Sequence, residues 1–403
     1  VVDYFLKYVA FDTQSAEDAG TVPSTEKQFA LAKLLSEQLK NIGVKDVSMS
    51  EHGYVYGTIP ANGDYNCQTV GFLAHMDTSP DCPDENVRPQ LVKHYDGKDI
   101  TLNKALGVKM TTKMFPFLKN YVGQDLITTD GTTLLGADDK AGIAEIMTMA
   151  EALIKENIPH GPISIAFTPD EEVGGGTDHF NVEKFGAQFA YTLDGDTEGE
   201  IQYENFNACK ADFEITGFAV HPGSSKDTMI NACLVAAEIN NMLPGLEIPR
   251  ETEDYEGFYH LTGMSGDVAK AELHYIVRDH DKDLFEAKKK TLKLIEKDMN
   301  EKWGEGTVAL TISEQYRNMA EIIATCMHLI DNAKKACENA DVAPLVLPIR
   351  GGTDGCQLSF KGLPCPNLGT GGHAYHGPYE HITVEGMDKS VDVVTELVKL
   401  YAM

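Results

Sequence analysis

Apolar runs that end in acidic residues or histidine recur along this chain, and they constrain its fold more than any other feature. Three such runs are residues 69–74 before His75 and Asp77, residues 162–168 before Asp170-Glu171-Glu172, and residues 189–193 before Asp194. Continuous apolar runs of this length are typical of strands buried inside a parallel sheet. In open α/β sheets, ligands bind outside the carboxyl ends of such strands. The pattern therefore predicts an α/β fold with a polar site along one edge of its sheet.

A fourth apolar stretch, Leu134-Leu135, leads through Gly136 into Asp138 and Asp139. We interpret it as a strand end and a tight turn, followed by a helix over 141–156. Two adjacent carboxylates are costly to bury without a cation, a helix N-terminus or water, so a solvated turn is the alternative for this stretch alone. Chance easily produces one acid-terminated strand but hardly four, and the whole set favours a metal site.

The length and charge of the chain limit the classes of protein to which it can belong. With 403 residues it exceeds what one hydrophobic core usually organises, which favours two domains. Its net charge of -28, from 62 acidic against 34 basic residues, opposes binding to nucleic acid or to an anionic membrane. No apolar run is long enough to span a bilayer. The eight cysteines form no Cys-x-x-Cys pair, which favours free thiols in a reducing cytoplasm.

The texture of the sequence changes within residues 207–317. There the order becomes strand, helix, strand, strand, helix, strand, which is typical of a compact α+β unit. We predict helices over 228–241 and 283–303 and strands near 211–217, 259–265, 270–277 and 307–313. The flanking segments, 1–206 and 318–403, then form one discontinuous α/β domain, whose mixed central sheet is flanked by helices and interrupted by the inserted domain.

Helical spacing and turn residues predict the remaining elements of the α/β domain. Thr25, with Gln28 three residues later, has the spacing of a capping box at the start of an amphipathic helix that ends near Gly43. We expect residues 80–125 to be irregular and to form excursions over the site. The other predicted elements are a short helix over 3–12, a hairpin of 45–50 and 54–59, a long helix over 319–340 and a C-terminal helix over 383–401.

Two imidazoles and three carboxylates stand out as metal-ligand candidates. They are His75, Asp138, Glu172, Asp194 and His376. Mixed nitrogen and oxygen ligation suits Zn²⁺, with Mn²⁺ or Co²⁺ possible. The set is too large for one catalytic zinc ion and large enough for two ions that share a carboxylate, which together can activate a bridging water. Glu171, beside a ligand but itself free, is the candidate proton shuttle. Asp77 can orient the imidazole two residues before it.

The chain resembles the co-catalytic zinc family of aminopeptidases, dipeptidases and aminoacylases. The resemblance lies in His75-x-Asp77, Gly136-Ala-Asp138-Asp-Lys-Ala-Gly142, Glu171-Glu172, Asp194 and His376-x-x-x-Glu380. Further shared phrases are Asp12-Thr13-Gln14, Pro23-Ser24-Thr25-Glu26, the stretch from His221 to Lys226, and the stretch from Pro348 to Gly355. Single acids are weak signals, whereas this ordered set is highly specific and extends over nearly the whole chain.

The resemblance implies a role for each metal-ligand candidate. Asp138 bridges two metal ions, His75 and Asp194 complete one of them, and Glu172 and His376 complete the other. The family's His-x-x-x-Glu spacing is what selects the last histidine over its neighbours.

The resemblance also implies how the ligands are supported and how the reaction is catalysed. Asp77 lies behind the first histidine ligand. Glu171 acts as general base and then as general acid. A cis peptide bond is expected between Asp138 and Asp139, a costly geometry that is tolerated at functional sites.

The inserted domain is implied to be a lid that also forms a homodimer. His221 would then reach the partner's site and stabilise an oxyanion. Asn231, Arg278 and Arg350 match positions that hold the carboxylate or carbonyl groups of a substrate, for which a guanidinium fork is well suited. Without the resemblance, His221 would be interpreted as a plain turn residue and Arg278 as part of a surface ion pair.

The function implied is hydrolysis of the N-terminal peptide bond of tripeptides by a hydroxide held between two metal ions, with Glu171 as base. A dipeptidase or an N-acyl-amino-acid deacylase with the same metal chemistry is one alternative. A peptide-binding or sensor protein on an inactive hydrolase scaffold is the other. The presence of every expected ligand and of the base argues against the latter.

Overall fold

A computed structural model describes residues 1–402 of the chain, which form two compact units. The first unit contains Val1–Tyr203, Glu321–Leu347 and the residues from Thr353 onward. The second contains Glu204–Ala320 and Pro348–Gly352. Each unit has its own sheet and its own hydrophobic core, and each is described by itself below.

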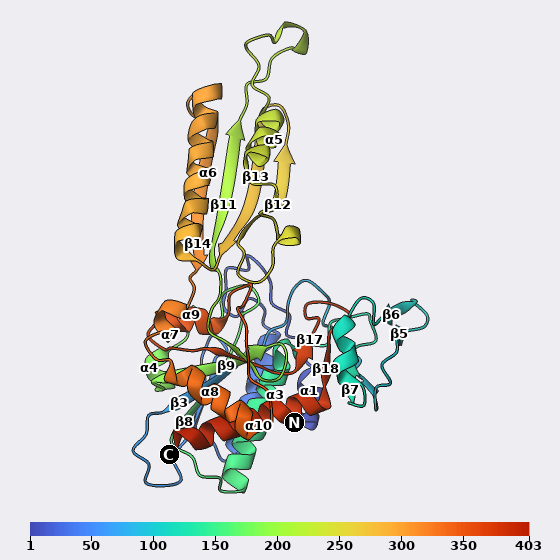
Figure 1. The fold of residues 1–403 in the computed structure, drawn as a ribbon, viewed down its shortest axis with the longest axis vertical. Coiled ribbons are helices and arrows are strands. Elements are labelled where there is room, and N and C mark those ends of the chain that lie inside the picture. Colours follow the sequence, from blue (N-terminus) through green and yellow to red (C-terminus); the bar gives the residue numbers. More distant parts are fainter. Residues whose placement is uncertain (403) are drawn as a thin grey trace. The chain divides into compact units, whose positions relative to one another are not determined.

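The first unit is built on an eight-stranded mixed sheet (Figure 1). In order across the sheet, the strands are β1 (Lys45–Met49), β2 (Val55–Ile59), β8 (Ile163–Thr168), β3 (Val70–His75), β9 (Phe189–Gly195), β16 (Asn367–Gly369), β10 (Glu200–Gln202) and β15 (Leu345–Val346). The central strands β8, β3 and β9 are parallel, and β1 and β2 form the predicted hairpin. The central strands are buried on both faces, which explains their continuous apolar sequences.

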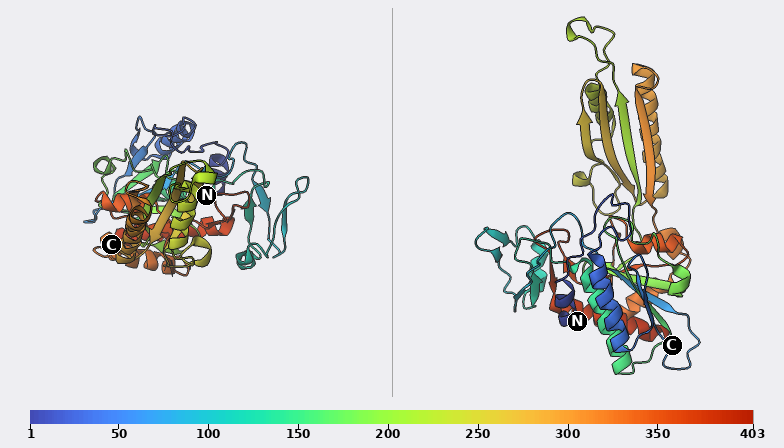
Figure 2. Two further views of the ribbon diagram at one scale, coloured as in Figure 1. Left: turned by 90° about the horizontal axis from the view of Figure 1, so that it is seen from above. Right: turned by 180° about the vertical axis from the view of Figure 1, so that it is seen from behind.

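Helices cover both faces of this sheet, as predicted. They are α1 (Val2–Tyr8), α2 (Gln28–Ile42), α3 (Ala137–Lys155), α4 (Val182–Phe185), α8 (His328–Asn339), α9 (Asp354–Phe360) and α10 (Val384–Tyr401). On one face, Phe185 of α4 and Leu358 of α9 pack with Leu73 of β3. On the other face, the hydroxyl of Tyr191 donates to the main-chain oxygen of Leu329 in α8 at 2.8 Å. Helices α2 and α3 lie side by side (Figure 2).

The segment predicted to be irregular has more structure than expected. Its elements are β4 (Gln90–Val92), β5 (Ile100–Asn103), β6 (Val108–Met110) and the 3₁₀ helix η1 (Pro116–Tyr121), and β7 (Leu126–Thr128) follows directly after it. Strands β4 and β7 join β17 (Gly372–His373) and β18 (His381–Thr383) in a four-stranded sheet, and β5 pairs with β6. Apolar residues such as Leu102, Met110 and Leu118 form a separate small core here. The sequence did not predict these short strands, because the proline and glycine residues of the segment are typical of turns.

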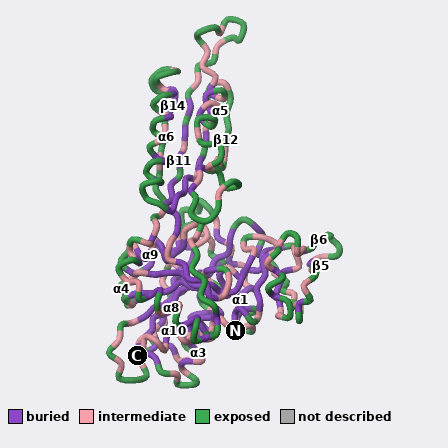
Figure 3. The backbone as a smooth tube through the Cα atoms, in the orientation of Figure 1, coloured by how far each residue is buried: buried purple, intermediate pink, exposed green. Residues whose placement is uncertain are grey.

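The second unit is an antiparallel sheet with two helices against one face. Its strands, in order, are β12 (Phe258–Gly266), β13 (Lys270–Asp279), β11 (Asn207–Thr216) and β14 (Val308–Tyr316); its helices are α5 (Ala232–Met242) and α6 (Lys282–Trp303), with short 3₁₀ turns η2 (Pro222–Ser224) and η3 (Pro249–Glu251). Along β11, Ala211 and Phe213 are buried whereas Lys210 and Glu214 are exposed. Such alternation is typical of a sheet with one solvated face. Figure 3 shows the exposed outer side of α6.

Two predicted helices begin later in the structure than the sequence indicated, and a third is divided in two. The capping box of Thr25 and Gln28 does not form, because the Thr25 hydroxyl donates to the main-chain oxygen of Gln14 at 2.7 Å and α2 begins only at Gln28. Helix α5 begins at Ala232 rather than near residue 228, because Asn231 caps it.

The long helix predicted over 319–340 is two helices, α7 (Ala320–Ile323) and α8. Between them the Thr325 hydroxyl donates to the main-chain oxygen of Ile322 at 2.7 Å, and Cys326 N donates to that of Ile323 at 2.8 Å. A threonine side chain that bonds the backbone in this way competes with helix continuation. Among the described residues, no helix is long and apolar enough to cross a membrane.

Candidate active site

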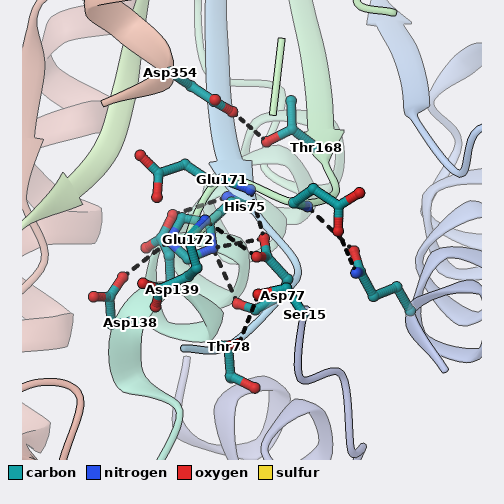
Figure 4. Close-up of polar contacts among 12 residues, drawn as sticks. Ser15, His75, Asp77, Thr78, Asp138, Asp139, Thr168, Glu171, Glu172 and Asp354 are labelled. Atoms are coloured by element: carbon teal, nitrogen blue, oxygen red, sulfur yellow. Dashed lines mark hydrogen bonds and ion pairs between the residues drawn. The ribbon is translucent and has the colours of Figure 1, made fainter. Parts of the chain in front are cut away.

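The predicted metal ligands from three strands meet at one edge of the central sheet. His75 is the last residue of β3, Asp194 lies near the end of β9, and Glu171 and Glu172 follow β8. Because β8, β3 and β9 are parallel neighbours, their carboxyl ends lie side by side. Figure 4 shows His75, Asp138, Glu171 and Glu172 gathered at this edge.

Asp138 connects the two histidine candidates. Its Oδ1 lies 2.9 Å from His75 Nε2, and its Oδ2 lies 3.2 Å from His376 Nε2. His376 Nε2 also lies 2.9 Å from Glu172 Oε2, and His75 Nε2 lies 3.4 Å from Asp194 Oδ1. The structure thus brings together all five metal-ligand candidates, which come from distant parts of the sequence.

The turn that carries Asp138 differs from the prediction. Leu134 and Leu135 are not a strand end, so three strands rather than four end at the site. Their backbone bonds are satisfied by other partners: the carboxylate of Glu380 accepts from Leu135 N at 2.6 Å, from Gly136 N at 2.9 Å and from Asp138 N at 3.0 Å. Gly136 has φ +81°, a conformation that glycine adopts without steric cost. A buried carboxylate therefore replaces the neighbouring strand that the sequence pattern suggested.

The carboxylate of Asp139 holds the backbone beside the metal-ligand candidates. Its Oδ2 accepts the backbone N–H of His75 at 3.0 Å, and its Oδ1 accepts that of Gly142 at 3.2 Å. The peptide bond between Asp138 and Asp139 is cis, as expected. Asp139 therefore connects the end of β3 to the first turn of α3.

Asp77 is completely buried and makes two kinds of contact. Its Oδ1 lies 3.3 Å from His75 Nδ1, on the side of the ring opposite the ligand cluster. Its two carboxylate oxygens accept the backbone N–H groups of Glu171 at 3.0 Å and of Glu172 at 3.1 Å. The main-chain oxygen of Asp77 also lies 3.0 Å from His75 Nδ1. Asp77 therefore orients the imidazole through both its main chain and its carboxylate, and the carboxylate also holds the turn that carries both glutamates.

Glu171 lines a narrow cavity together with His75, Asp194 and Asp354. Burial raises the pKa of Glu171 well above its usual value, and the nearby carboxylates of Asp194 and Asp354 raise it further. Asp354 itself accepts a hydrogen bond from the Thr168 hydroxyl at 2.7 Å. A carboxyl group with a raised pKa can retain a proton near neutral pH, which a general base must do after it has taken one.

The converging donors fit divalent cations. Two groups offer ligand atoms within 4.8 Å of one another: His75 with Asp138 and Glu172, and His75 with Glu171 and Asp194. In addition, the buried Oε1 of Glu172 has no hydrogen-bond partner among the described residues. Buried carboxylates that face one another and lack partners are costly, and a bound cation removes that cost. Imidazole and carboxylate together are donors that zinc accepts.

The pKa values of the clustered side chains also indicate a site for positive charge. Burial lowers the pKa of His376, but hydrogen bonds to Asp138 and Glu172 raise it to about 11. Burial likewise lowers the pKa of His75, yet Asp194 and Asp138 bring it well above its usual value. Burial, with the charge of Asp138, raises the pKa of Glu172 to about 8. The cluster therefore attracts positive charge, which divalent ions can supply.

All four predicted substrate-binding residues lie in the second unit. His221 is exposed, and its Nδ1 accepts the backbone N–H of Gly223 at 3.1 Å. Asn231 caps α5 by accepting the backbone N–H of Leu234 at 3.3 Å.

The two arginines of this group bind main-chain carbonyls. Arg278 Nη1 donates to the main-chain oxygens of Val277 at 3.1 Å and Cys209 at 3.3 Å. Arg350 Nη1 donates to that of Asp254 at 2.6 Å. These contacts lie within the second unit, and the substrate-binding role of the arginines stays a prediction.

Sequence reasoning gave no supporting role to Asp139, Glu380 or Asp170. The available signal was their position: each is an acid directly beside, or at fixed spacing from, a predicted ligand or base. Their partners are backbone N–H groups and side chains far away in the sequence, which no local pattern reveals.

The α/β domain gathers imidazoles and carboxylates at the carboxyl edge of its sheet, and Glu171 lies among them. This arrangement is typical of metal-dependent hydrolases. The sequence profile described as "Peptidase family M20/M25/M40" matches residues 130–400. The chain is 53% identical to Peptidase T of Clostridium novyi (strain NT) over 403 residues, covering 100% of this chain and 99% of the relative. It is 52% identical to Peptidase T of Caldanaerobacter subterraneus over 402 residues, covering 100% and 98%.

A solved structure gives the same result. The crystal structure of aminopeptidase PepT from Bacillus cereus ATCC 10987 matches with a TM-score of 0.78 at 25% identity, covering 100% of this chain and 98% of that one. The chain therefore belongs to peptidase family M20/M25/M40 and, within it, to the peptidase T group. It is a metal-dependent peptidase.

Proposed function

We propose that this peptidase removes the N-terminal residue from tripeptides. One observation carries the proposal: two imidazoles meet the two oxygens of Asp138, with Glu171 beside them. The relatives named Peptidase T match over the full length, and the solved relative is named an aminopeptidase. The name aminopeptidase supports cleavage at the N-terminal peptide bond. The tripeptide substrate is what the resemblance in the sequence implies, and the geometry of the site does not define it by itself.

According to this proposal, the five metal-ligand candidates would hold two divalent ions. Asp138 would be shared between them, with His75 and Asp194 as the other ligands of one ion and Glu172 and His376 as those of the other. Zinc suits this mixture of donors, with manganese or cobalt as alternatives. When bound, such ions lower the pKa of a shared water and polarise the scissile carbonyl.

The chain's own side chains move the proton. Glu171 takes a proton from the attacking water and returns it to the leaving amine. Its buried carboxyl, with a raised pKa, suits both steps. Asp77 holds the backbone of Glu171 and keeps His75 oriented. In this proposal Glu171 moves the proton, and the other five side chains are the metal ligands.

Further predictions from the sequence extend the proposal. His221, Asn231, Arg278 and Arg350 recognise the substrate, the second unit acts as a lid, and the protein forms a homodimer through it. The eight free cysteines accord with a cytoplasmic location.

A substrate panel tests the proposal. The metal-loaded protein is assayed with dipeptides, tripeptides, tetrapeptides, an N-acetylated tripeptide and N-acetyl amino acids. The proposal predicts fastest release of the N-terminal residue from the free tripeptide and no reaction of its acetylated form. Preference for dipeptides or for acetylated amino acids would instead support the dipeptidase or deacylase alternative. Absence of any turnover by protein with bound zinc would support a binding protein.

A further inference from the structure

The turn that carries Glu171 and Glu172 begins at Asp170, whose backbone is left-handed with φ +56°. Residues other than glycine adopt this conformation only when local interactions compensate its steric cost. Asp170 directly precedes Glu171, so its backbone angles set the direction in which Glu171 leaves the end of β8. Whatever fixes Asp170 therefore also fixes the proposed general base.

Ser24 and Gln28 hold Asp170 through four hydrogen bonds. The carboxylate of Asp170 accepts from Ser24 N and Ser24 Oγ at 2.6 Å each and from Gln28 Nε2 at 2.7 Å. Asp170 N also donates to Gln28 Oε1 at 3.3 Å. Asp170 and Gln28 are each only 1% exposed, so water competes little for these bonds. In a site of low dielectric, bonds to a carboxylate are strong and directional.

These two residues belong to a segment that is itself braced. The hydroxyl of Ser24 accepts the backbone N–H of Ala16 at 2.9 Å, and the hydroxyl of Thr25 donates to the main-chain oxygen of Gln14 at 2.7 Å. This arrangement explains why Thr25 and Gln28 do not form a capping box. Their polar groups face the preceding loop and the catalytic turn instead of the end of α2.

We propose that Ser24 and Gln28 are positioning residues for the general base. They hold Asp170 from one side of the turn, while Asp77 holds the N–H groups of Glu171 and Glu172 from the other. The inference rests on the proposed function, because it requires Glu171 to act as the base. Neither Ser24 nor Gln28 needs to touch substrate or metal to act in this way.

Removal of this hold lets Asp170 leave the left-handed region, which displaces the carboxylate of Glu171. A displacement of about 1 Å in a reacting group can cost roughly 100-fold in rate. The double variant Ser24→Ala/Gln28→Ala is therefore expected to lose roughly 10- to 100-fold in kcat for a tripeptide. KM and the bound metal content are expected to stay near those of the wild type, because no ligand or substrate contact is removed.

Matched controls come from α2, the helix that Gln28 begins. Among the described residues, the buried hydroxyl removed by Ser36→Ala bonds only the main-chain oxygen of Ala32, and the amide removed by Gln38→Ala bonds only the hydroxyl of Tyr8. Both should keep wild-type kcat. The conservative variant Ser24→Thr retains the hydroxyl and should restore most of the activity lost in Ser24→Ala. The single variants Ser24→Ala and Gln28→Ala give the same test if the double variant does not fold.

A second measurement does not depend on activity. Amide hydrogen exchange of the metal-free protein reports the turn directly, since Glu171 N–H and Glu172 N–H are bound by Asp77. Faster exchange of the peptide containing residues 169–176 is expected in the Ser24 and Gln28 variants and not in the Ser36 and Gln38 controls.

These measurements distinguish failure of the inference about Ser24 and Gln28 from failure of the proposed function. A lower kcat with unchanged KM, unchanged metal content and faster exchange supports the inference. The inference is overturned if the variants keep a kcat near that of the wild type, or if they lose activity only in proportion to lost metal. In either case, a wild type that cleaves tripeptides leaves the proposed function standing. A wild type that holds its metal but cleaves no tripeptide overturns the proposed function and this inference with it.

Discussion

The carboxylate of Asp77 accepts the backbone N–H of Glu171 at 3.0 Å. A residue that follows one strand of the sheet thereby fixes the proposed base, which follows the neighbouring strand. The same carboxylate lies beside His75 and also holds Glu172. Asp77 consequently sets the position of the proposed base relative to two metal-ligand candidates, His75 and Glu172.

Asp77→Asn should therefore impair catalysis and metal binding together. An asparagine amide offers one accepting oxygen, so it can satisfy only one of the two glutamate N–H groups, and it removes the charge beside His75. Loss of such a supporting carboxylate typically costs roughly 10- to 100-fold in metal affinity or activity. Metal titration and kcat measurements on the same variant check this. Asp64→Asn, at an exposed position, is the control and should behave as the wild type.

Glu171→Gln should separate catalysis from metal binding. The amide keeps the size of the side chain but cannot accept a proton, and general base catalysis contributes roughly 100- to 10,000-fold. We expect kcat to fall by that factor while KM and the metal content stay close to wild type, as measured by steady-state kinetics and metal analysis. Glu183→Gln on the exposed side of α4 is the control. Near-normal turnover of Glu171→Gln would exclude this residue as the base.

The glycines that follow the turn of Glu171 and Glu172 give a prediction about stability. A methyl group on Gly176 would lie 2.0 Å from Asp354 Oδ1, whereas one on the adjacent Gly175 would meet nothing closer than 3.5 Å. Gly176→Ala should therefore displace the buried Asp354, at a cost of about 1–3 kcal/mol in the free energy of unfolding. Gly175→Ala should be tolerated. Urea denaturation of both variants tests the pair, and equal stability of the two would contradict this packing.

Two buried histidines make the first unit sensitive to acid. Burial lowers the pKa of His373 to about 3 and that of His381 to about 4. Their pKa in the unfolded chain is about 6.5. The folded state then binds fewer protons than the unfolded state between about pH 6.5 and 4, so the free energy of unfolding falls as the pH falls through this window. Each histidine contributes a slope of about 1.4 kcal/mol per pH unit.

The variant His381→Phe isolates this contribution. The ring of His381 stacks on that of Phe117 at 5.6 Å, so a phenylalanine retains the aromatic contact while removing the titrating group. Urea denaturation at pH 7.5, 6 and 4.5 should show a shallower loss of stability in this variant than in the wild type, by about 1.4 kcal/mol per pH unit. Parallel curves for the two proteins would show that His381 does not titrate as argued.

Local patterns predicted the parts of the fold that local physics controls. Strands β3 and β9 end where the sequence places His75 and Asp194, because a buried strand must be apolar and its polar ligands can appear only at its end. The helices that flank the sheet and the α+β character of residues 207–317 followed from periodicity in the same way.

Predictions failed where a distant side chain decides the local structure. Leu134 and Leu135 look like a strand end, but Glu380 satisfies the backbone there. Thr25 and Gln28 have the spacing of a capping box, but Gln28 binds Asp170 instead. In both cases a carboxylate remote in sequence takes the place of the hydrogen-bond partner that the pattern predicted. These two carboxylates, Glu380 and Asp170, also shape the site.

Metal analysis and tripeptide hydrolysis measured on one sample test the central claim most directly. The account predicts two divalent ions per chain, loss of both ions and of activity on treatment with a chelator, and recovery of activity on addition of zinc, manganese or cobalt. It also predicts that the free N-terminal residue of the tripeptide is the product released. Full tripeptide hydrolysis by protein that binds no metal would contradict the account.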